Sequence, residues 1–245
     1  MRTIRRVSLK LNREKWKRIK ELVEAYAKEK DAHLLFFGND ASFAGCAGDR
    51  DRRDLLVHAG YRSGFGLQAR SWKLALKDAI ETTDKQWSQI AADLRPCIAQ
   101  NTEWREEMKR YAYWLLSFPQ RVALLCASQA PIPAHFELVP AQQRIVRNYL
   151  RRVIRRHRGT RPRVRKVRSA CFDSNMYTVF FEGGTQYIRV MSLQKGKRIV
   201  IPLCGNTPIG GNIRLVLEKR DRRIEIHFTA EIKATPSLTG SPCAL

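Results

Sequence analysis

The stretch "TQYIRVMSLQKGKRIVIPL", Thr185 to Leu203, alternates apolar and polar residues on both sides of a short turn, Gln194 to Lys197. A period of two predicts two half-buried β-strands joined as an antiparallel hairpin. Three further runs of the same kind flank it in the sequence: "MYTVFFE", "IRLVLEKR" and "RIEIHFTAEIK". Their close spacing and short turns predict a five-stranded antiparallel meander over residues 161–235 that curls into a small barrel.

Outside this meander, one strand and several helices are expected. "TIRRVSLKL", Thr3 to Leu11, also has a period of two and predicts a first strand within residues 1–11. Asn12 is a helix N-cap candidate, and apolar residues then recur at three- and four-residue spacing to about Lys30. The Gly- and Asp-rich segment Phe36 to Asp54 is expected to be a loop.

The middle of the chain has the pattern of a helical bundle. One apolar stripe runs from Trp72 to Leu94 and another from Trp104 to Leu115. Tryptophans at this spacing are core residues more often than base-stacking residues. The predicted fold class is therefore α+β, with a helical domain over residues 12–160 inserted into the small OB-like barrel.

The most basic segment is "RNYLRRVIRRHRGTRPRVRKVR", Arg147 to Arg168, inside a stretch from Leu138 to Phe172 that contains no Asp or Glu. On a helical wheel, apolar residues from Ile145 to Ile154 occupy one half, and arginines from Arg144 to Arg158 occupy the other. Solvated faces usually mix the two signs of charge, whereas this segment excludes acids, which favours a nucleic-acid groove.

The charge of the whole chain points to the same partner. Lys and Arg number 46 against 23 Asp and Glu, which gives a formal net charge of +23 and a pI near 10.4. Such a charge repels itself unless a polyanion neutralises it. Arginine suits forked phosphate contacts and stacking on bases, as in structured RNA. The predicted RNA-binding residues are Arg147, Arg151, Arg155, Arg158, Arg163, Arg165, Lys166 and Arg168.

Other function classes lack support in the sequence. No apolar run approaches the roughly 18 residues of a membrane span, and Met1 to Asn12 has no signal-peptide core. The six cysteines show no C-x-x-C and no zinc spacing, and the five histidines are far apart. No P-loop, Rossmann or G-x-S-x-G motif is present. A cytoplasmic, nucleoid-associated prokaryotic protein with no catalytic residue, metal site or cofactor of its own is therefore expected.

Three segments of the chain resemble one known family in their order. They are "VSLKLNREKWKRIKELVEAYAKEKD" (Val7 to Asp31), "LQARSWKLALKDAIETTDKQW" (Leu67 to Trp87) and "TQYIRVMSLQKGKRIVIPLCG" (Thr185 to Gly205). A strand, a helical insertion and a barrel in this order resemble the N-terminal lobe of TnpB-like transposon-encoded RNA-guided nucleases and type V CRISPR effectors. The barrel would be the wedge domain and the helices the recognition domain.

This resemblance implies two nucleic-acid partners. In the family, these two domains bind the guide or scaffold RNA and read the duplex next to the DNA target. The predicted DNA-binding residues near the helical insertion are Tyr61, Arg62, Arg70 and Lys73.

One part of the family pattern is missing from this sequence. Family members continue into a RuvC-type nuclease domain with a metal-binding Asp in an Asp-x-Gly context, but no Asp here is followed two residues later by Gly. Two-metal cleavage needs clustered carboxylates. The chain alone is therefore not expected to cut, and Mg²⁺ would act only if a RuvC half were supplied. Residues 236–245 are interpreted as a tail or a truncated link to such a domain.

Three alternative functions stay open. The chain is one half of a split RNA-guided nuclease whose RuvC half is encoded separately, and that subunit would be its partner. Alternatively, it is a transposon-derived regulator that binds duplex DNA without RNA. The third alternative is a generic basic RNA-binding protein, against which the large helical insertion argues.

Overall fold

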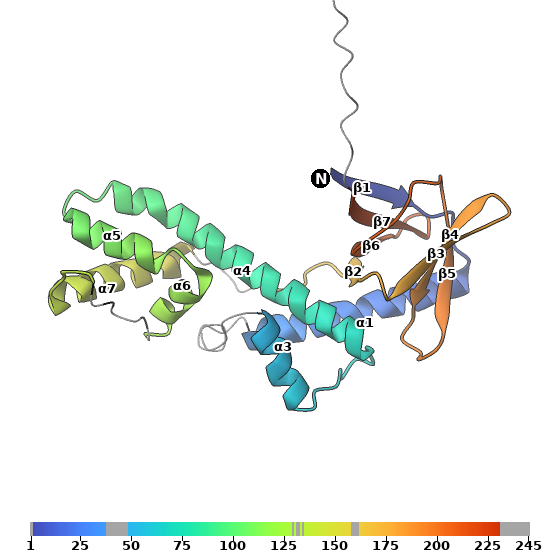
Figure 1. Cartoon of the computed structure of the whole chain (residues 1–245), viewed down its shortest axis with the longest axis horizontal. Helices are drawn as coiled ribbons and strands as arrows, with labels where there is room; N and C mark the ends of the chain where they lie inside the picture. The colour runs from blue at the N-terminus through green and yellow to red at the C-terminus, as the bar shows by residue number, and fades with distance from the viewer. Residues whose placement is uncertain are drawn as a thin grey trace, which may run out of the picture. The chain divides into compact units, whose positions relative to one another are not determined.

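The computed structural model describes residues 2–37, 49–128, 130, 133, 135–157 and 162–230. They form a mixed α+β structure in two units (Figure 1). The β unit consists of residues 1–20 and 169–245, and the helical unit consists of residues 21–168. The general α+β class predicted from the sequence is confirmed.

The β unit contains two antiparallel sheets. Their strand orders are β1-β7-β6-β2 and β3-β4-β5. The strands are β1 (Arg2–Val7), β2 (Ser169–Phe172), β3 (Tyr177–Glu182), β4 (Thr185–Met191), β5 (Arg198–Leu203), β6 (Ile213–Glu218) and β7 (Arg223–Ala230). The predicted strands are confirmed within the described residues, but they do not form one five-stranded meander, because β6 and β7 pair in a different sheet from β3, β4 and β5. The sequence did not reveal β2. Its four residues are too few to display an alternation.

The two sheets do not close into a barrel, so that part of the prediction is wrong. An isolated bridge between Ser8 and Leu203 joins the sheets at one edge, and the Cys204 amide donates to the Val7 carbonyl at 2.9 Å. At the other edge, no ladder joins β2 to β3 in the described residues. Asp173 caps a turn there by accepting the Asn175 amide at 2.9 Å. The chain turns here, and β3 pairs with β4 alone among the described strands.

The turn between β3 and β4 follows from its two glycines. Gly183 and Gly184 have φ angles of 55° and 74°, and they join Glu182 directly to its partner Thr185. A two-residue hairpin with positive φ at both central positions matches the twist of the strands, and glycine adopts it without steric cost. The turn predicted at this position is confirmed.

One buried arginine stabilises the loop that follows β5. Arg6 on β1 is only 5% exposed. Its guanidinium donates to the carbonyls of Cys204 at 2.8 Å, Thr207 at 2.5 Å and Gly205. Burial lowers the pKa of Arg6. The hydrogen bonds to these carbonyls compensate for the burial of the Arg6 charge. Arg6 therefore has a structural role in the β unit.

The helical unit contains most of α1 (Arg13–Phe37), of which residues up to Lys20 belong to the β unit. The other helices are α3 (Asp49–His58), α4 (Ala69–Ala99), α5 (Glu106–Leu115), α6 (Pro119–Cys126) and α7 (Pro140–His157). The expected loop from Phe36 to Asp54 is partly helical, because α1 extends to Phe37 and α3 begins at Asp49. Residues 38–48 lie outside the described residues.

The core of the helical unit is built from α4 to α7. Trp87, Tyr111 and Leu150 are each 0% exposed within one hydrophobic cluster contributed by these helices. Trp72 and Trp104 are also buried, at 4% and 7% exposure. These burials confirm that the tryptophans spaced along α4 and before α5 are core residues. The same cluster anchors the apolar side of α7.

Candidate nucleic-acid interface

The apolar side of α7 holds this helix in the core. Val146, Leu150 and Ile154 are each 0% exposed. Gln143 is buried beside them, and its side-chain amide donates to the Leu138 carbonyl at 2.9 Å just before the helix. Ile145, expected on the packed side, is 53% exposed. The buried stripe is therefore narrower than the sequence predicted, and a wider part of α7 faces solvent.

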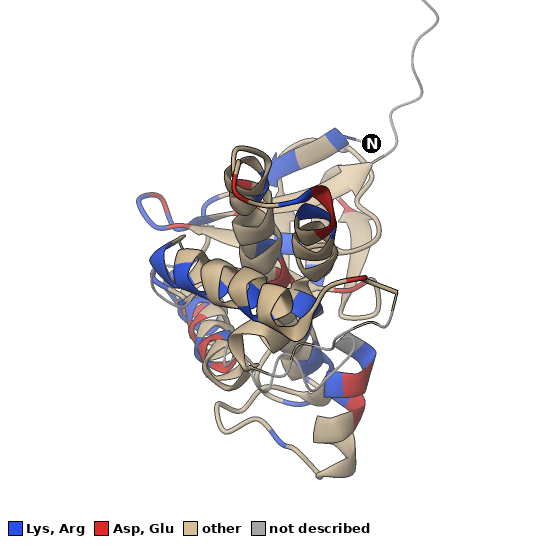
Figure 2. Ribbon diagram, turned by 90° about the vertical axis from the view of Figure 1, so that its left-hand side faces the viewer, with Lys and Arg blue, Asp and Glu red and all other residues tan. Residues whose placement is uncertain are grey.

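The other side of α7 is positively charged along its length. We call it the α7 arginine face, and it consists of Arg144, Arg147, Arg151, Arg152, Arg155 and Arg156. Figure 2 shows α7 with blue residues and no red one. Within the described part of the chain, no carboxylate forms an ion pair with any of these arginines. Their charges are therefore not neutralised by described carboxylates of the protein.

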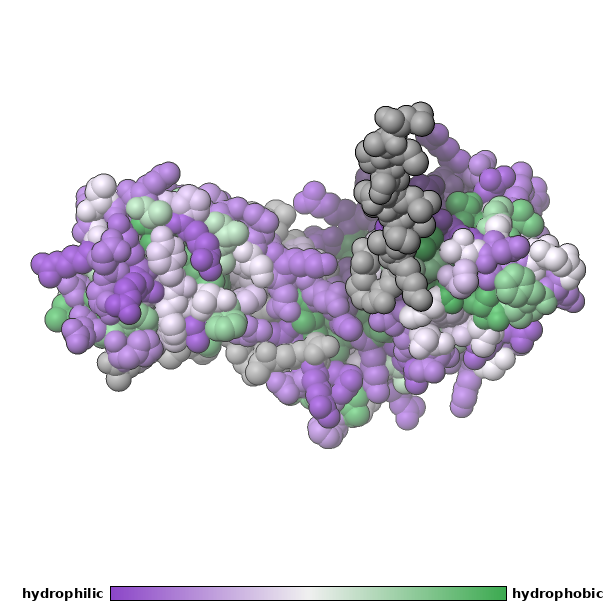
Figure 3. Space-filling view, turned by 45° about the horizontal axis from the view of Figure 1, so that its top comes forward, coloured by the Kyte–Doolittle hydropathy of each residue, from purple (hydrophilic) through white to green (hydrophobic). Residues whose placement is uncertain are grey.

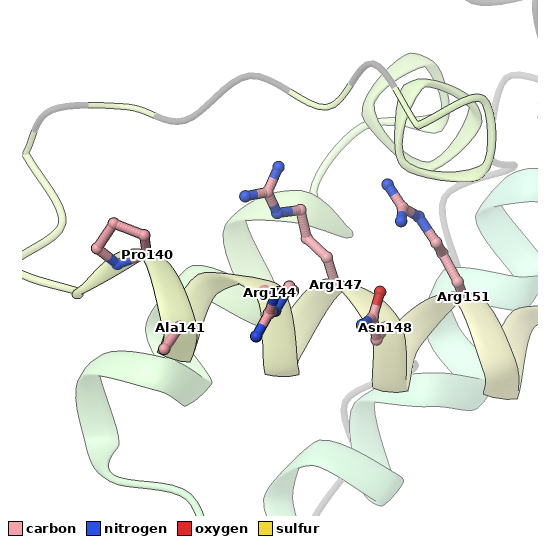
Figure 4. Close-up of a pocket in the computed structure, with 6 residues that line it drawn as sticks. All are labelled: Pro140, Ala141, Arg144, Arg147, Asn148 and Arg151. Atoms are coloured by element: carbon pink, nitrogen blue, oxygen red, sulfur yellow. The ribbon is translucent and has the colours of Figure 1, made fainter.

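Two adjoining hollows follow the α7 arginine face. The first, of about 550 Å³, is lined by Pro140, Ala141, Arg144, Arg147, Asn148 and Arg151 (Figure 4). The second, of about 510 Å³, is lined by Asn148, Arg151, Arg152, Arg155 and Arg156. Because Asn148 and Arg151 line both, the two hollows lie next to each other along the helix. An elongated basic surface of this kind suits a polyanion better than a compact ligand.

The structure holds two of these arginines in place. Arg151 Nε donates to the Leu125 carbonyl in α6 at 2.8 Å, and Arg147 Nε donates to the Gln143 carbonyl at 3.4 Å. In Figure 4 both guanidinium groups project to the same side of α7, whereas Arg144 points elsewhere. Each guanidinium carries five N–H donors, so a bond through Nε leaves the terminal nitrogens available for phosphate oxygens.

A buried phenol lies within the field of the same two arginines. Tyr111 on α5 is 0% exposed, and its hydroxyl has no hydrogen-bond partner among the described residues. Burial raises the pKa of Tyr111, and the charges of Arg147 and Arg151 act against that rise. These charges therefore reach into the core beneath the α7 arginine face.

The basic segment after α7 is exposed and has no regular secondary structure where it is described. Arg163, Arg165, Lys166 and Arg168 all expose their side chains. The Val164 amide donates to Asp31 Oδ1 on α1 at 2.9 Å and fixes this segment within the helical unit. Arg158, also predicted to bind RNA, lies outside the described residues.

The predicted DNA-binding residue Tyr61 takes part in a buried polar cluster. Its hydroxyl donates to Glu29 Oε1 at 2.7 Å, and the Ser63 hydroxyl donates to Glu29 Oε2 at 2.6 Å. His33 Nε2 lies 3.2 Å from Glu29 Oε1. Burial raises the pKa of Tyr61, as does its bond to the charged Glu29. Burial alone would raise the pKa of Glu29, but the contacts from His33, Ser63 and Tyr61 together lower it.

Of the other predicted DNA-binding residues, Arg62 lies in the segment between α3 and α4, and Arg70 and Lys73 lie in the first turns of α4. Arg62 and Arg70 are exposed, and Lys73 is half-buried with its ammonium 5.7 Å from the centre of the Trp72 ring. The Tyr61 ring packs at 5.1 Å against the same tryptophan. Tyr61 and Lys73 thus both contact Trp72, and Tyr61 directs its hydroxyl to Glu29.

The hollows also include residues that were not among the predicted RNA-binding residues. These residues are Arg144, Asn148, Arg152 and Arg156. The signal that could have found them is the helical wheel itself, because each falls outside the buried stripe. The predicted residues Arg147, Arg151 and Arg155 follow a four-residue spacing, which leaves out the neighbouring polar residues of the same helix side.

The described residues contain neither a candidate metal-ion site nor a candidate membrane-spanning helix. No group of His, Cys, Asp and Glu in this part of the chain could hold a metal ion. None of the described helices has the length and apolarity needed to cross a membrane. No protein-family model and no curated protein matches the sequence.

Proposed function

We propose that this chain binds structured RNA through the α7 arginine face and the segment Arg163 to Arg168. The observation that carries the proposal is a row of arginines without described acidic partners, lining two adjoining hollows on a helix whose other side is fixed in the core. A rigid helix presents its guanidinium groups with little loss of backbone freedom when a ligand binds. Phosphates are the ligands that suit such donors best.

Structured RNA is favoured over a regular duplex by the directions of the arginines. Arg147 and Arg151 project to one side of α7 and Arg144 to another (Figure 4). A folded RNA turns its backbone through many directions and can meet donors on several sides of one helix. The excess of arginine over lysine on this face supports contacts that combine forked hydrogen bonds with stacking.

On the strength of the family resemblance, we further propose a more specific role. The helical unit would be the recognition domain, and the two sheets of the β unit would together serve as an open, wedge-like domain. The lobe would hold the guide or scaffold RNA and contact the duplex beside a DNA target through Arg62, Arg70 and Lys73. Catalysis with Mg²⁺ would belong to a RuvC-type domain, whose Asp-x-Gly motif is not found in residues 1–245.

The test is to purify the chain from its host at moderate salt, with its genomic neighbourhood intact, and to sequence the nucleic acid that remains bound. One dominant structured RNA transcribed from beside the gene supports the guide-binding role. A mixture of many RNAs supports the generic RNA-binding alternative. RNase-resistant retention of specific duplex DNA would overturn the proposal in favour of the DNA-binding regulator.

A further inference from the structure

The outer face of the β3-β4-β5 sheet has a composition unlike that of an ordinary solvated sheet face. Strand alternation places Ile188, Val190 and Ile201, each 0% exposed, on the inner face. The opposite face, which we call the outer sheet face, carries ten residues by the same alternation: Thr178, Phe180, Glu182, Thr185, Tyr187, Arg189, Met191, Arg198, Val200 and Pro202. All ten are half-buried or exposed. Figure 3 shows hydrophobic side chains gathered on the visible surface over the strands of the β unit.

Three flat groups stack on one another on this face. Phe180 on β3 and Tyr187 on β4 are direct cross-strand partners, and their rings stack with centroids 5.2 Å apart and an angle of 14° between planes. The Arg189 guanidinium lies 5.0 Å from the centre of the Phe180 ring on the diagonal position. The stack therefore consists of a guanidinium, a phenyl ring and a phenol in contact.

The surroundings of this stack carry positive charge. Between Tyr177 and Leu203 the only acidic residue is Glu182, which ends β3 on the same face as Phe180. The same span contains four basic residues, Arg189, Lys195, Lys197 and Arg198, all exposed. An aromatic pair alone could serve only to stabilise the sheet. An aromatic pair surrounded by basic residues suits a polyanionic ligand that also carries flat apolar groups.

We propose that the outer sheet face binds a single-stranded RNA segment by stacking its bases on Tyr187 and Phe180, with Arg189 and Arg198 contacting the phosphates. Every base has a π-face, so this mode tolerates many sequences, and it requires unpaired bases because a duplex hides those faces. The inference rests on the proposed function for its ligand class. It adds a second RNA-binding site, in the β unit, where the bases stack on aromatic rings.

The experiment uses the full chain and a short uridine-rich RNA strand that carries one 2-aminopurine, whose fluorescence falls when it stacks. The wild type is expected to quench the probe. Tyr187→Leu keeps an apolar side chain but removes the ring, and it should weaken binding roughly tenfold or more and abolish the quench. Phe180→Leu should act in the same direction. Tyr187→Phe should bind as the wild type does, since stacking needs the ring and not the hydroxyl.

The matched control is Phe181→Leu. Phe181 is the neighbour of Phe180 on β3, is 60% exposed and alternates to the opposite side of the strand. This variant should bind the probe normally. Because stacking is not ionic, Tyr187→Leu should also leave the salt dependence of binding unchanged, which separates this site from the α7 arginine face.

Retained affinity and quenching in a folded Tyr187→Leu variant would overturn this inference. Binding that depends on the α7 arginines but not on either ring would overturn it while the proposed function stands. A wild type that binds neither single-stranded nor structured RNA would refute both. A changed oligomeric state with unchanged RNA binding would assign the face to a second copy of the chain and likewise overturn the inference.

Discussion

Arg6 and the α7 arginine face use the same side chain in opposite ways. Arg6 is 5% exposed and directs its donors to three carbonyl groups of one loop. Arg144 and Arg155 are exposed and line open hollows. A guanidinium whose donors are occupied by backbone oxygens stabilises the fold, whereas one whose donors face solvent remains available to a ligand. The number of arginines in a sequence does not separate these two uses.

Arg151 combines both uses. Its Nε is bonded to the Leu125 carbonyl in α6, yet the same residue lines both hollows. Fixing part of a side chain reduces the entropy lost when its remaining donors bind a phosphate. The comparison of Arg6 with the α7 arginine face therefore yields separable predictions for stability and for RNA affinity.

The largest effect is expected from charge reversal on the α7 arginine face. Arg144, Arg152 and Arg155, changed together to Glu, should lower RNA affinity about a thousand-fold, since each charge-assisted contact contributes about 1.5 kcal/mol. Thermal unfolding should change little, because these side chains are outside the core. Filter binding and calorimetry measure the two quantities.

The matched control for this triple variant makes the same change in net charge on another helix. Lys77, Lys85 and Arg95 are exposed on α4. Their combined change to Glu should reduce RNA affinity only slightly. An equal loss in both variants would mean that the net charge, and not the α7 arginine face, determines binding.

The next effect is on stability alone. Arg6→Leu leaves three loop carbonyls without their donor, and it should lower the free energy of unfolding by about 3 kcal/mol. RNA affinity, measured under conditions in which the variant is folded, should match the wild type. A large loss of affinity in the folded variant would place Arg6 at the interface and break the comparison.

Glu29 extends the comparison to a buried acid. Its pKa is lower in the folded chain than in the unfolded chain, so its charge stabilises the fold above its usual pKa. That stabilisation is lost as the pH falls through the folded-state value. Glu29→Gln should cost about 2 kcal/mol near neutral pH. The difference from the wild type should shrink in acid, as chemical denaturation at several pH values would show.

A constant difference from neutral to acid pH would contradict the assignment of Glu29 as a charged acceptor. Tyr61→Phe provides the companion variant, because it removes the donor to Glu29 and keeps the ring beside Trp72. It should lower stability by about 1 kcal/mol. If Tyr61→Phe lowered DNA affinity and left stability unchanged, Tyr61 would belong to the DNA interface.

The smallest effect separates two arginines on the same helix. Arg151→Gln should weaken RNA binding and also lower stability by about 1 kcal/mol, because it loses the bond to the Leu125 carbonyl. Arg155→Gln should weaken RNA binding to a similar extent without a cost in stability. Paired denaturation and binding curves for the two single variants test this difference.

The sequence predicted those features that depend on local periodicity. Val146, Leu150 and Ile154 could be assigned to the core from their spacing, as could the strands β3 to β7. The α7 arginine face follows from the same wheel, and its hollows add to the predicted set the polar residues Arg144, Asn148, Arg152 and Arg156. Local pattern therefore accounts for the main elements and for the basic side of α7.

Features that depend on long-range contacts could not be predicted in this way. The barrel is open because no ladder joins β2 to β3 in the described part of the chain, and a strand pattern does not specify which strand edges pair. Tyr61 is a predicted DNA-binding residue, but its hydroxyl donates to Glu29, which is 32 residues away in the sequence. Arg6 occupies a polar position in an alternating strand, and only the loop after β5 gives it partners.

The most direct test of the central claim is the salt dependence of RNA affinity for the wild type and for the Arg144, Arg152 and Arg155 charge-reversal variant. Each phosphate contact contributes about 0.7 to 0.9 to the slope of log affinity against log salt concentration. If these three arginines bind phosphates, the slope of the variant should be shallower by about 2. Parallel lines for the two proteins, with equal affinity, would contradict the assignment of α7 as the RNA interface.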